Sequence, residues 1–215
     1  MGIVFGMTGT AEPSYQVVSA GLLGQVGELR YYTPFVVAEV PGRDGFGVLA
    51  KYIGVFGEPA NEGRRALAMT APVTMVNRKP ESMAMTSPVT MTSRSGTDYM
   101  GFVLPFEIQD INEAPKPLDR LITLRKVPAR LVAVRTYSGW HSEDVARGQF
   151  GILKEELKKL GLCEDQREEY EVSQYHPPFT LPFLRRNEIW CELKQSQSLP
   201  AVGKLLATLV VKGAK

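Results

Sequence analysis

The stretch YTPFVVAEV, Tyr32–Val40, has a counterpart in the second half of the chain, KVPARLVAV at Lys126–Val134. Both stretches have a proline in the third position, Pro34 in the first and Pro128 in the second, and both continue with a run rich in apolar residues. Apolar, β-branched runs that follow a proline turn are typical of buried β-strands. The shared pattern therefore predicts two related units in one chain.

In each unit, two predicted strands precede a helix and two more strands follow it. In the first unit, apolar residues at helical spacing indicate a short helix, with Asp44 as its N-cap and Gly54 at its end. In the second, Ser142 caps a longer helix that runs to Leu160, where Gly161 stops it. The strands lie within Gly27–Val40 (two strands), Tyr99–Leu104, Leu121–Lys126, Leu131–Tyr137, Tyr170–Tyr175 and Asn187–Leu193. Two such units, each with one helix packed outside the joined sheets, predict an α+β fold.

The first unit also contains a methionine-rich phrase written twice, ALAMTAPVTM at Ala66–Met75 and SMAMTSPVTM at Ser82–Met91. Both copies alternate with period two, which predicts strands. The proline inside each copy indicates an edge strand or a bulge, because proline cannot donate to a ladder. We predict that the second copy pairs with Tyr99–Leu104 through a turn at Ser93–Gly96, and that the first copy lies beside it or at the sheet edge.

Composition and charge argue against several classes of protein. Of the 215 residues, 44% are hydrophobic and 22% are charged, which are the values of a globular domain with a buried core. A net charge of +2 without a basic cluster predicts no nucleic-acid partner. The longest apolar run, Leu205–Val211, is short of the ~20 residues that a membrane span needs. Two cysteines and the lack of a secretory or transit signal lead us to expect a cytoplasmic protein, and we expect a monomer.

Neither histidine has the neighbours that catalysis or metal binding would require. His141 precedes a helix cap and His176 precedes two prolines, and the sequence lacks nucleophile, zinc-helix and phosphate-loop motifs. We therefore expect a binding protein rather than an enzyme. A curled sheet beside an apolar helix would form a concave apolar pocket for one small ligand. Methionines such as Met69 and Met75 would either line that pocket or fill gaps in the core.

The passage YHPPFTLPFLRRNEIWCEL, Tyr175–Leu193, is the most distinctive in the chain. It resembles the ending of the SOUL haem-binding protein family, most closely that of its cytosolic plant and algal members. Further similar segments are AMT-x-PV in both methionine phrases, LAKYIGVFG at Leu49–Gly57, FVLP at Phe102–Pro105, EAPKP at Glu113–Pro117 and YSG at Tyr137–Gly139. The resemblance covers about residues 1–193 and implies a single domain, a distorted β-barrel of two pseudo-symmetric ββαββ halves with two flanking helices. Residues 194–215 would form an appended tail, either helical or loosely ordered.

The resemblance also implies reversible binding of haem b or another tetrapyrrole, without catalysis. In animal members haem lies against the first helix. The matching apolar positions here are Phe46, Leu49, Ala50 and Ile53. Basic side chains near that helix would bind the propionates by charge-assisted hydrogen bonds, and the candidates are Lys51, Arg43 and Arg64.

Some animal members are proposed to ligate the haem iron through a histidine in an E-L-R-x-Y strand. This chain has Tyr31 at that position, within Glu28–Tyr32. A tyrosinate can ligate ferric haem, so Tyr31 is a candidate axial ligand. The alternatives are an apolar site without an axial ligand, or a physiological ligand other than haem.

A second hypothesis depends on Glu188, in the last predicted strand. GyrI-like multidrug-sensing modules have the same two-half fold, and in them a pocket glutamate neutralises lipophilic cations. Glu188 is then the acid of an alternative pocket, unless it is a buried, hydrogen-bonded structural group. We expect Arg185 and Arg186 to pair with it or to lie in solvent. A third hypothesis is a scaffold that contacts a protein partner through the short helix or through Leu199–Val211.

Overall fold

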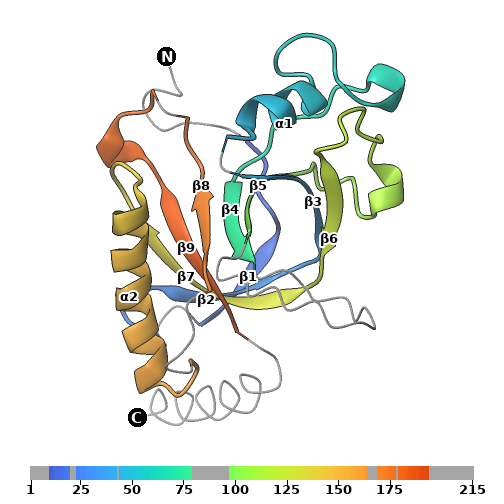
Figure 1. Cartoon of the computed structure of the whole chain (residues 1–215). Helices are drawn as coiled ribbons and strands as arrows, with labels where there is room; N and C mark the ends of the chain where they lie inside the picture. Colours follow the sequence, from blue (N-terminus) through green and yellow to red (C-terminus); the bar gives the residue numbers. More distant parts are fainter. Residues whose placement is uncertain are drawn as a thin grey trace, which may run out of the picture.

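The computed structural model of the chain describes residues 10–19, 23–42, 44–78, 97–163, 169–177 and 179–193. These residues form one curled antiparallel sheet of nine strands and two α-helices (Figure 1). The fold class is therefore α+β, as the sequence predicts. Among the helices in these ranges, none is both long enough and apolar enough to cross a membrane. The predicted tail, residues 194–215, lies outside the described residues.

The strands and helices follow the predicted order. The first unit contains β2 (Glu28–Tyr32), β3 (Phe35–Pro41), α1 (Phe46–Ile53), β4 (Val73–Arg78) and β5 (Thr97–Val103). The second contains β6 (Thr123–Val127), β7 (Arg130–Tyr137), α2 (Glu143–Lys159), β8 (Glu171–Gln174) and β9 (Asn187–Leu193). Short 3-10 turns, η2 (Glu62–Arg64), η3 (Ile111–Glu113) and η4 (Pro182–Leu184), lie in the connections. A further strand, β1 (Tyr15–Ser19), precedes both units and is missing from the prediction.

The strand order shows how the two units combine. It reads β1-β2-β7-β9-β8-β4-β5-β3-β6. If β1 is set aside and each strand is exchanged for its counterpart in the other unit, the same order results, read from the opposite end. The units are therefore related by a pseudo-two-fold axis between β4 and β8. Strands of different units pair in β2–β7, β3–β6 and β4–β8, so the units share one sheet.

Both helices pack on the same face of the sheet, which we call the outer face (Figure 1). Helix α2 covers a core cluster that includes Leu29 and Ile189. Helix α1 covers a second cluster that includes Ala38 and Phe102. Met75 of β4 packs against both clusters, so the outer core is continuous across the pseudo-two-fold axis. The opposite face, which we call the inner face, carries a third cluster of buried side chains that includes Tyr32 and Trp190.

Helix α1 begins differently from the prediction. Its N-cap is Gly45 rather than Asp44, and no side chain caps this end. A side chain at position 45 would clash with β3, because a Cβ there would lie 1.8 Å from a methyl group of Val40. The predicted end is confirmed, with Gly54 as the C-cap in the left-handed conformation (φ 88°). The predicted cap of α2 is also confirmed, since the Ser142 hydroxyl accepts a backbone N–H of the first turn at 3.2 Å.

The methionine phrase is placed differently from the prediction. Residues 73–75 of the first copy lie in β4, which is an interior strand between β8 and β5 rather than an edge strand. Pro72 is compatible with this arrangement because it precedes β4, so that its missing N–H removes no hydrogen bond from the sheet. Strand β5 already has β4 and β3 as its neighbours, so the first copy holds the position predicted for the second. The second copy, Met85–Met91, lies outside the described residues.

Candidate functional site

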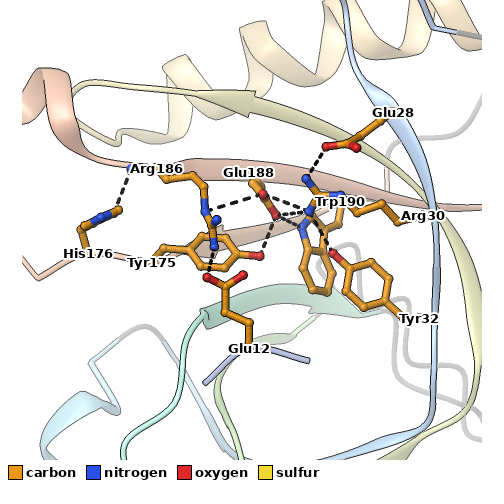
Figure 2. Close-up of polar contacts among 9 residues, drawn as sticks. All are labelled: Glu12, Glu28, Arg30, Tyr32, Tyr175, His176, Arg186, Glu188 and Trp190. Carbon is orange, nitrogen blue, oxygen red and sulfur yellow. Dashed lines mark hydrogen bonds and ion pairs between the residues drawn. The ribbon is translucent and has the colours of Figure 1, made fainter. Parts of the chain in front are cut away.

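A chain of ion pairs crosses the inner face of the sheet (Figure 2). Strand β2 contributes Glu28, Arg30 and Tyr32, which share this face because side chains of a strand alternate between its two sides. Strand β9 contributes Glu188 and Trp190 in the same way. Residues from the first and last strands of the two units therefore meet at one place.

Glu188 is the centre of this network, and its side chain is fully buried. Nη1 of Arg30 lies 3.1 Å from both carboxylate oxygens. The Tyr175 hydroxyl and the Trp190 indole N–H each donate a hydrogen bond to Oε2 at 2.7 Å. A buried carboxylate is strongly unfavourable unless it is paired and hydrogen-bonded, and these three donors meet both needs.

The network shifts the pKa values of its members. Burial raises the pKa of Tyr175, and the neighbouring Glu188 carboxylate raises it further. Burial also raises the pKa of Tyr32, although the hydrogen bond from Arg30 acts in the opposite direction. Burial acts to lower the pKa of Arg30, but Glu188 and Glu28 more than offset this effect, so that pKa lies above its ordinary value. At neutral pH the site therefore contains neutral phenols and a permanent cation.

Carboxylates close both ends of the network. At one end, Nη2 of Arg30 donates to Glu28 at 2.5 Å. At the other end, Nε of Arg186 lies 3.8 Å from Glu188, and its Nη2 donates to Glu12. Of the two alternatives expected for Arg186, pairing with Glu188 or exposure to solvent, the structure shows the ion pair, although Arg30 is the nearer partner of Glu188.

Aromatic rings and further ion pairs fill the rest of the inner face. The rings of Tyr32 and Trp190 are 1% exposed, with centroids 4.5 Å apart. Arg130 is also buried, and it pairs with Glu171 at 2.8 Å and with Glu192 at 3.2 Å. This face is a packed interior, and its charges are balanced by protein groups.

A small cleft of about 70 Å³ opens beside Glu12, between the segment that precedes β1 and the segment that follows β5. Its walls include Pro13, Phe35, Val103 and Ile108. Pockets that enclose drug-sized ligands measure roughly 300–1,000 Å³. A tetrapyrrole therefore does not fit inside this cleft.

The haem candidates on α1 have two different environments. Leu49, Ala50 and Ile53 are at most 3% exposed and form part of the core beneath the helix. Phe46 is 39% exposed, and its ring packs edge-to-face on a core phenylalanine of β5. Lys51 is exposed on the side of α1 that faces away from the sheet.

Other exposed groups lie on α1 or follow it in the chain. Gly47 has open space where a side chain would be. Val55 and Phe56, directly after the helix, are 43% and 61% exposed. Arg64 is exposed and pairs with a nearby glutamate at 3.2 Å, whereas Arg43 lies outside the described residues.

Tyr31 lies on a different part of the sheet. It is 40% exposed, and it alternates with Arg30 and Tyr32, which point to the inner face. Helix α1 contacts β3 and β5, and β2 lies near the opposite end of the strand order. The structure therefore places Tyr31 on β2, whereas the α1 candidates lie on a helix that packs against β3 and β5.

Comparison with known families decides what kind of domain this is. A family model described as SOUL heme-binding protein matches residues 10–192. The chain belongs to the SOUL heme-binding protein family. Membership supports haem or another tetrapyrrole as the ligand class. No curated protein matches the sequence.

Solved structures give a more distant likeness to this SOUL domain. The C-terminal domain of EcmrR has a TM-score of 0.50 at 15% identity, covering 84% of this chain and 98% of that one. A hydrolase from Listeria innocua has a TM-score of 0.46 at 11% identity, covering 78% and 91%. SAV2435 bound to tetraphenylphosphonium has a TM-score of 0.40 at 9% identity, covering 86% and 97%. At such low identities the likeness concerns the fold alone.

Sequence reasoning found Glu188 but missed the residues around it. The signal for Arg30 and Tyr32 was present, because two polar side chains at alternate positions of a buried strand must share a face. Their meeting with β9 depends on β7, which pairs with both β2 and β9. Tyr175 was likewise visible only as the start of the family passage. The Arg185 guanidinium lies 3.9 Å from the ring centroid of Trp140, and its Nε donates to the Thr180 carbonyl at 2.8 Å.

Proposed function

We propose that this SOUL protein binds haem b or another tetrapyrrole reversibly on the exposed surface of α1, without catalysis. The family match over residues 10–192 carries the proposal. Two structural observations favour binding on the surface. The inner face is filled by aromatic rings and ion pairs, and the cleft beside it has a volume of about 70 Å³.

In this proposal Phe46, Lys51, Val55 and Phe56 form the site. Phe46 directly precedes Gly47, and Val55 and Phe56 follow the end of the helix. The missing side chain at Gly47 leaves that part of the helix surface flat. A planar macrocycle laid there would bury apolar surface, at about 25 cal/mol per Å². The Lys51 ammonium would bind a propionate through a charge-assisted hydrogen bond. Leu49, Ala50 and Ile53 would support the helix from the core rather than touch the ligand.

We infer that the protein provides no axial ligand from Tyr31. Tyr31 lies on β2, whereas α1 contacts β3 and β5. A site of this kind holds metal-free protoporphyrin as well as haemin, because apolar contact and propionate binding do not involve the iron. The macrocycle is then a cargo, and we propose a cytoplasmic, monomeric carrier or buffer. The two cysteines support a reducing compartment, and the net charge of +2 supports a partner other than nucleic acid.

The alternative, a pocket for lipophilic cations at Glu188, has less support. Such a pocket needs a carboxylate that a ligand can reach and whose charge is available. Glu188 is fully buried, and the Arg30 guanidinium already balances its charge at 3.1 Å. A cation at this position would have to displace Arg30.

Titration of the pure protein with haemin and with protoporphyrin IX tests the proposal. We expect saturable one-to-one binding of both, followed by the Soret absorbance and by quenching of tryptophan fluorescence. The double variant Phe46→Ala/Lys51→Gln should bind both about tenfold more weakly, since it loses one apolar contact and one charge-assisted hydrogen bond. Tyr31→Phe should leave the haemin spectrum unchanged.

Phe183→Ala/Lys159→Gln is the matched control, because it removes the same side chains from exposed positions on η4 and α2. If the control variant loses as much macrocycle affinity as the α1 variant, α1 is not the binding site. If the protein binds haemin alone and Tyr31→Phe alters its spectrum, binding depends on iron ligation by Tyr31 rather than on the surface of α1. Absence of binding to both macrocycles would refute it.

A further inference from the structure

The contact between Glu12 and Arg186 closes the inner-face network with a carboxylate from a remote part of the chain (Figure 2). Glu12 lies in the segment before β1, and Arg186 directly precedes β9. Their side chains are 32% and 35% exposed, so the contact lies at the rim of the network. Solutes can therefore reach it.

Arg186 is held by contacts that do not involve Glu12. Its guanidinium stacks on the Tyr175 ring, 3.5 Å from the centroid. Its backbone N–H donates to Nδ1 of His176 at 3.0 Å, and its carbonyl accepts the Tyr175 N–H at 3.2 Å. A guanidinium fixed in this way is preorganised to bind a carboxylate through parallel N–H donors.

Glu188 does not depend on Arg186 for its hydrogen bonds. Arg30 and two neutral donors satisfy that carboxylate, while Arg186 stands 3.8 Å away. Nε of Arg186 is buried, and no hydrogen-bond partner for it is found in the described part of the chain. The close partner of the Arg186 charge is therefore Glu12, a side chain at the rim.

The Glu12 side chain can move without detaching its segment. The Ala11 carbonyl accepts a backbone N–H from residue 71 at 2.9 Å, and the Ser14 carbonyl accepts the Thr33 N–H at 3.1 Å. Glu12 also lines the cleft of about 70 Å³. Glu12 therefore contacts both Arg186 and the cleft, whose walls are partly apolar, and rotation of this one side chain would open a path between the Arg186 guanidinium and the cleft.

We propose that Arg186 binds a small carboxylate whose short apolar tail enters this cleft, and that Glu12 occupies the site as an internal substitute. The exchange replaces one carboxylate with another, so the charge of the network is unchanged. The cleft has room for a few carbon atoms, which selects a short-chain or compact acid. The proposal does not depend on tetrapyrrole binding, because α1 contributes no residue to this site.

Calorimetric titration with sodium hexanoate tests the proposal. Glu12→Gln removes the internal competitor at constant size, and we expect it to bind hexanoate at least tenfold more tightly than the unaltered protein. Glu12→Gln/Arg186→Gln should lose that gain. Hexan-1-ol, which has the same tail without the charge, should bind neither protein measurably.

Glu58→Gln is the matched control, since it breaks an exposed ion pair, with Arg64, outside this site. The proposal is overturned by equal hexanoate affinity in Glu12→Gln and the unaltered protein, by an equal gain in Glu58→Gln, or by binding of hexanol as tight as that of hexanoate. If the double variant does not fold, amide shifts at Tyr175 and Arg186 on adding hexanoate to Glu12→Gln locate the ligand. Shifts elsewhere would refute the assignment.

Discussion

Arg30 and Glu188 form a buried ion pair between the first strand of one unit and the last strand of the other. Nη1 of Arg30 lies 3.1 Å from both oxygens of Glu188, and their side chains are 6% and 0% exposed. Removal of one partner from such a pair leaves an uncompensated buried charge. The pair should therefore matter more to stability than its surface counterparts.

The first prediction concerns this pair. Arg30→Met should lower the free energy of unfolding by about 3–5 kcal/mol, because Glu188 would remain buried without a cation. Glu188→Gln should be less severe, since an amide still accepts from Tyr175 and Trp190. Arg30→Met/Glu188→Gln should cost less than the sum of the single changes, as urea unfolding will show. In the exposed control, Glu58→Gln, the loss should be under about 1 kcal/mol. Strictly additive losses would argue against coupling between the two residues.

The second prediction concerns high pH. Burial raises the pKa of Tyr52 and of Tyr137 to about 12, above the ordinary tyrosine value of about 10. A raised pKa in the folded state means that this state holds the proton more firmly than the unfolded chain. The contribution of these tyrosines to stability is therefore complete below about pH 10 and is lost as the pH rises through 12.

The buried phenols should thus ionise as the protein unfolds. Phenolate absorbance and circular dichroism, followed in one alkaline titration, should show part of the absorbance change coinciding with loss of structure. Tyr52→Phe should shift that transition to higher pH. A single smooth ionisation of all tyrosines in the folded protein would contradict the burial described for them.

The third prediction contrasts two glycines. A Cβ on Gly27 would lie 2.4 Å from the backbone oxygen of Val134, so Gly27→Ala should destabilise by about 1–3 kcal/mol. Gly148 lies inside α2 with open space around it, so Gly148→Ala should stabilise by up to about 1 kcal/mol. Thermal unfolding of both variants is the measurement. If both variants change stability in the same direction, the close approach of the Val134 backbone does not determine the effect at Gly27.

The fourth prediction separates the two methionine phrases. Met75 packs against both outer clusters, so Met75→Ala should lower stability by about 2 kcal/mol or more. We expect Met91→Ala to cost less, because the first copy already occupies the place beside β5. Equal losses in chemical denaturation would show that both copies contribute equally to the core.

The sequence predicted those parts of the fold whose signals are local. Strands β3 and β7 carry apolar runs beside proline turns, and α2 has Ser142 and Gly161 at its ends. Strand β1 was missed, because five residues are too few for an alternating pattern that would distinguish a strand from any other short apolar segment. Strand β4 was expected at an edge or at a bulge, because Pro72 cannot donate to a ladder. It lies instead between β5 and β8, and this position is fixed by its pairing with those two strands, which its own residues do not reveal.

The candidate site divides in the same way. Glu188 could be singled out within β9, but its partner Arg30 is brought to it through pairing with β7, which no spacing in the sequence reveals. The α1 positions chosen by resemblance include both buried and exposed residues. The helical spacing of apolar residues indicates which side of the helix faces the core, but it does not indicate which residues on the solvent-facing side bind a ligand. Leu49 faces the core, whereas Lys51 does not.

The interleaving of the two units has a consequence for the growing chain on the ribosome. When β2 to β5 have been synthesised, their partners β7, β6 and β8 do not yet exist, so three strand edges await residues made much later. Unpaired edges are templates for wrong association, and ladders between distant segments close slowly. We therefore expect the nascent first unit to remain unfolded, and to depend on chaperones, until β9 has left the exit tunnel.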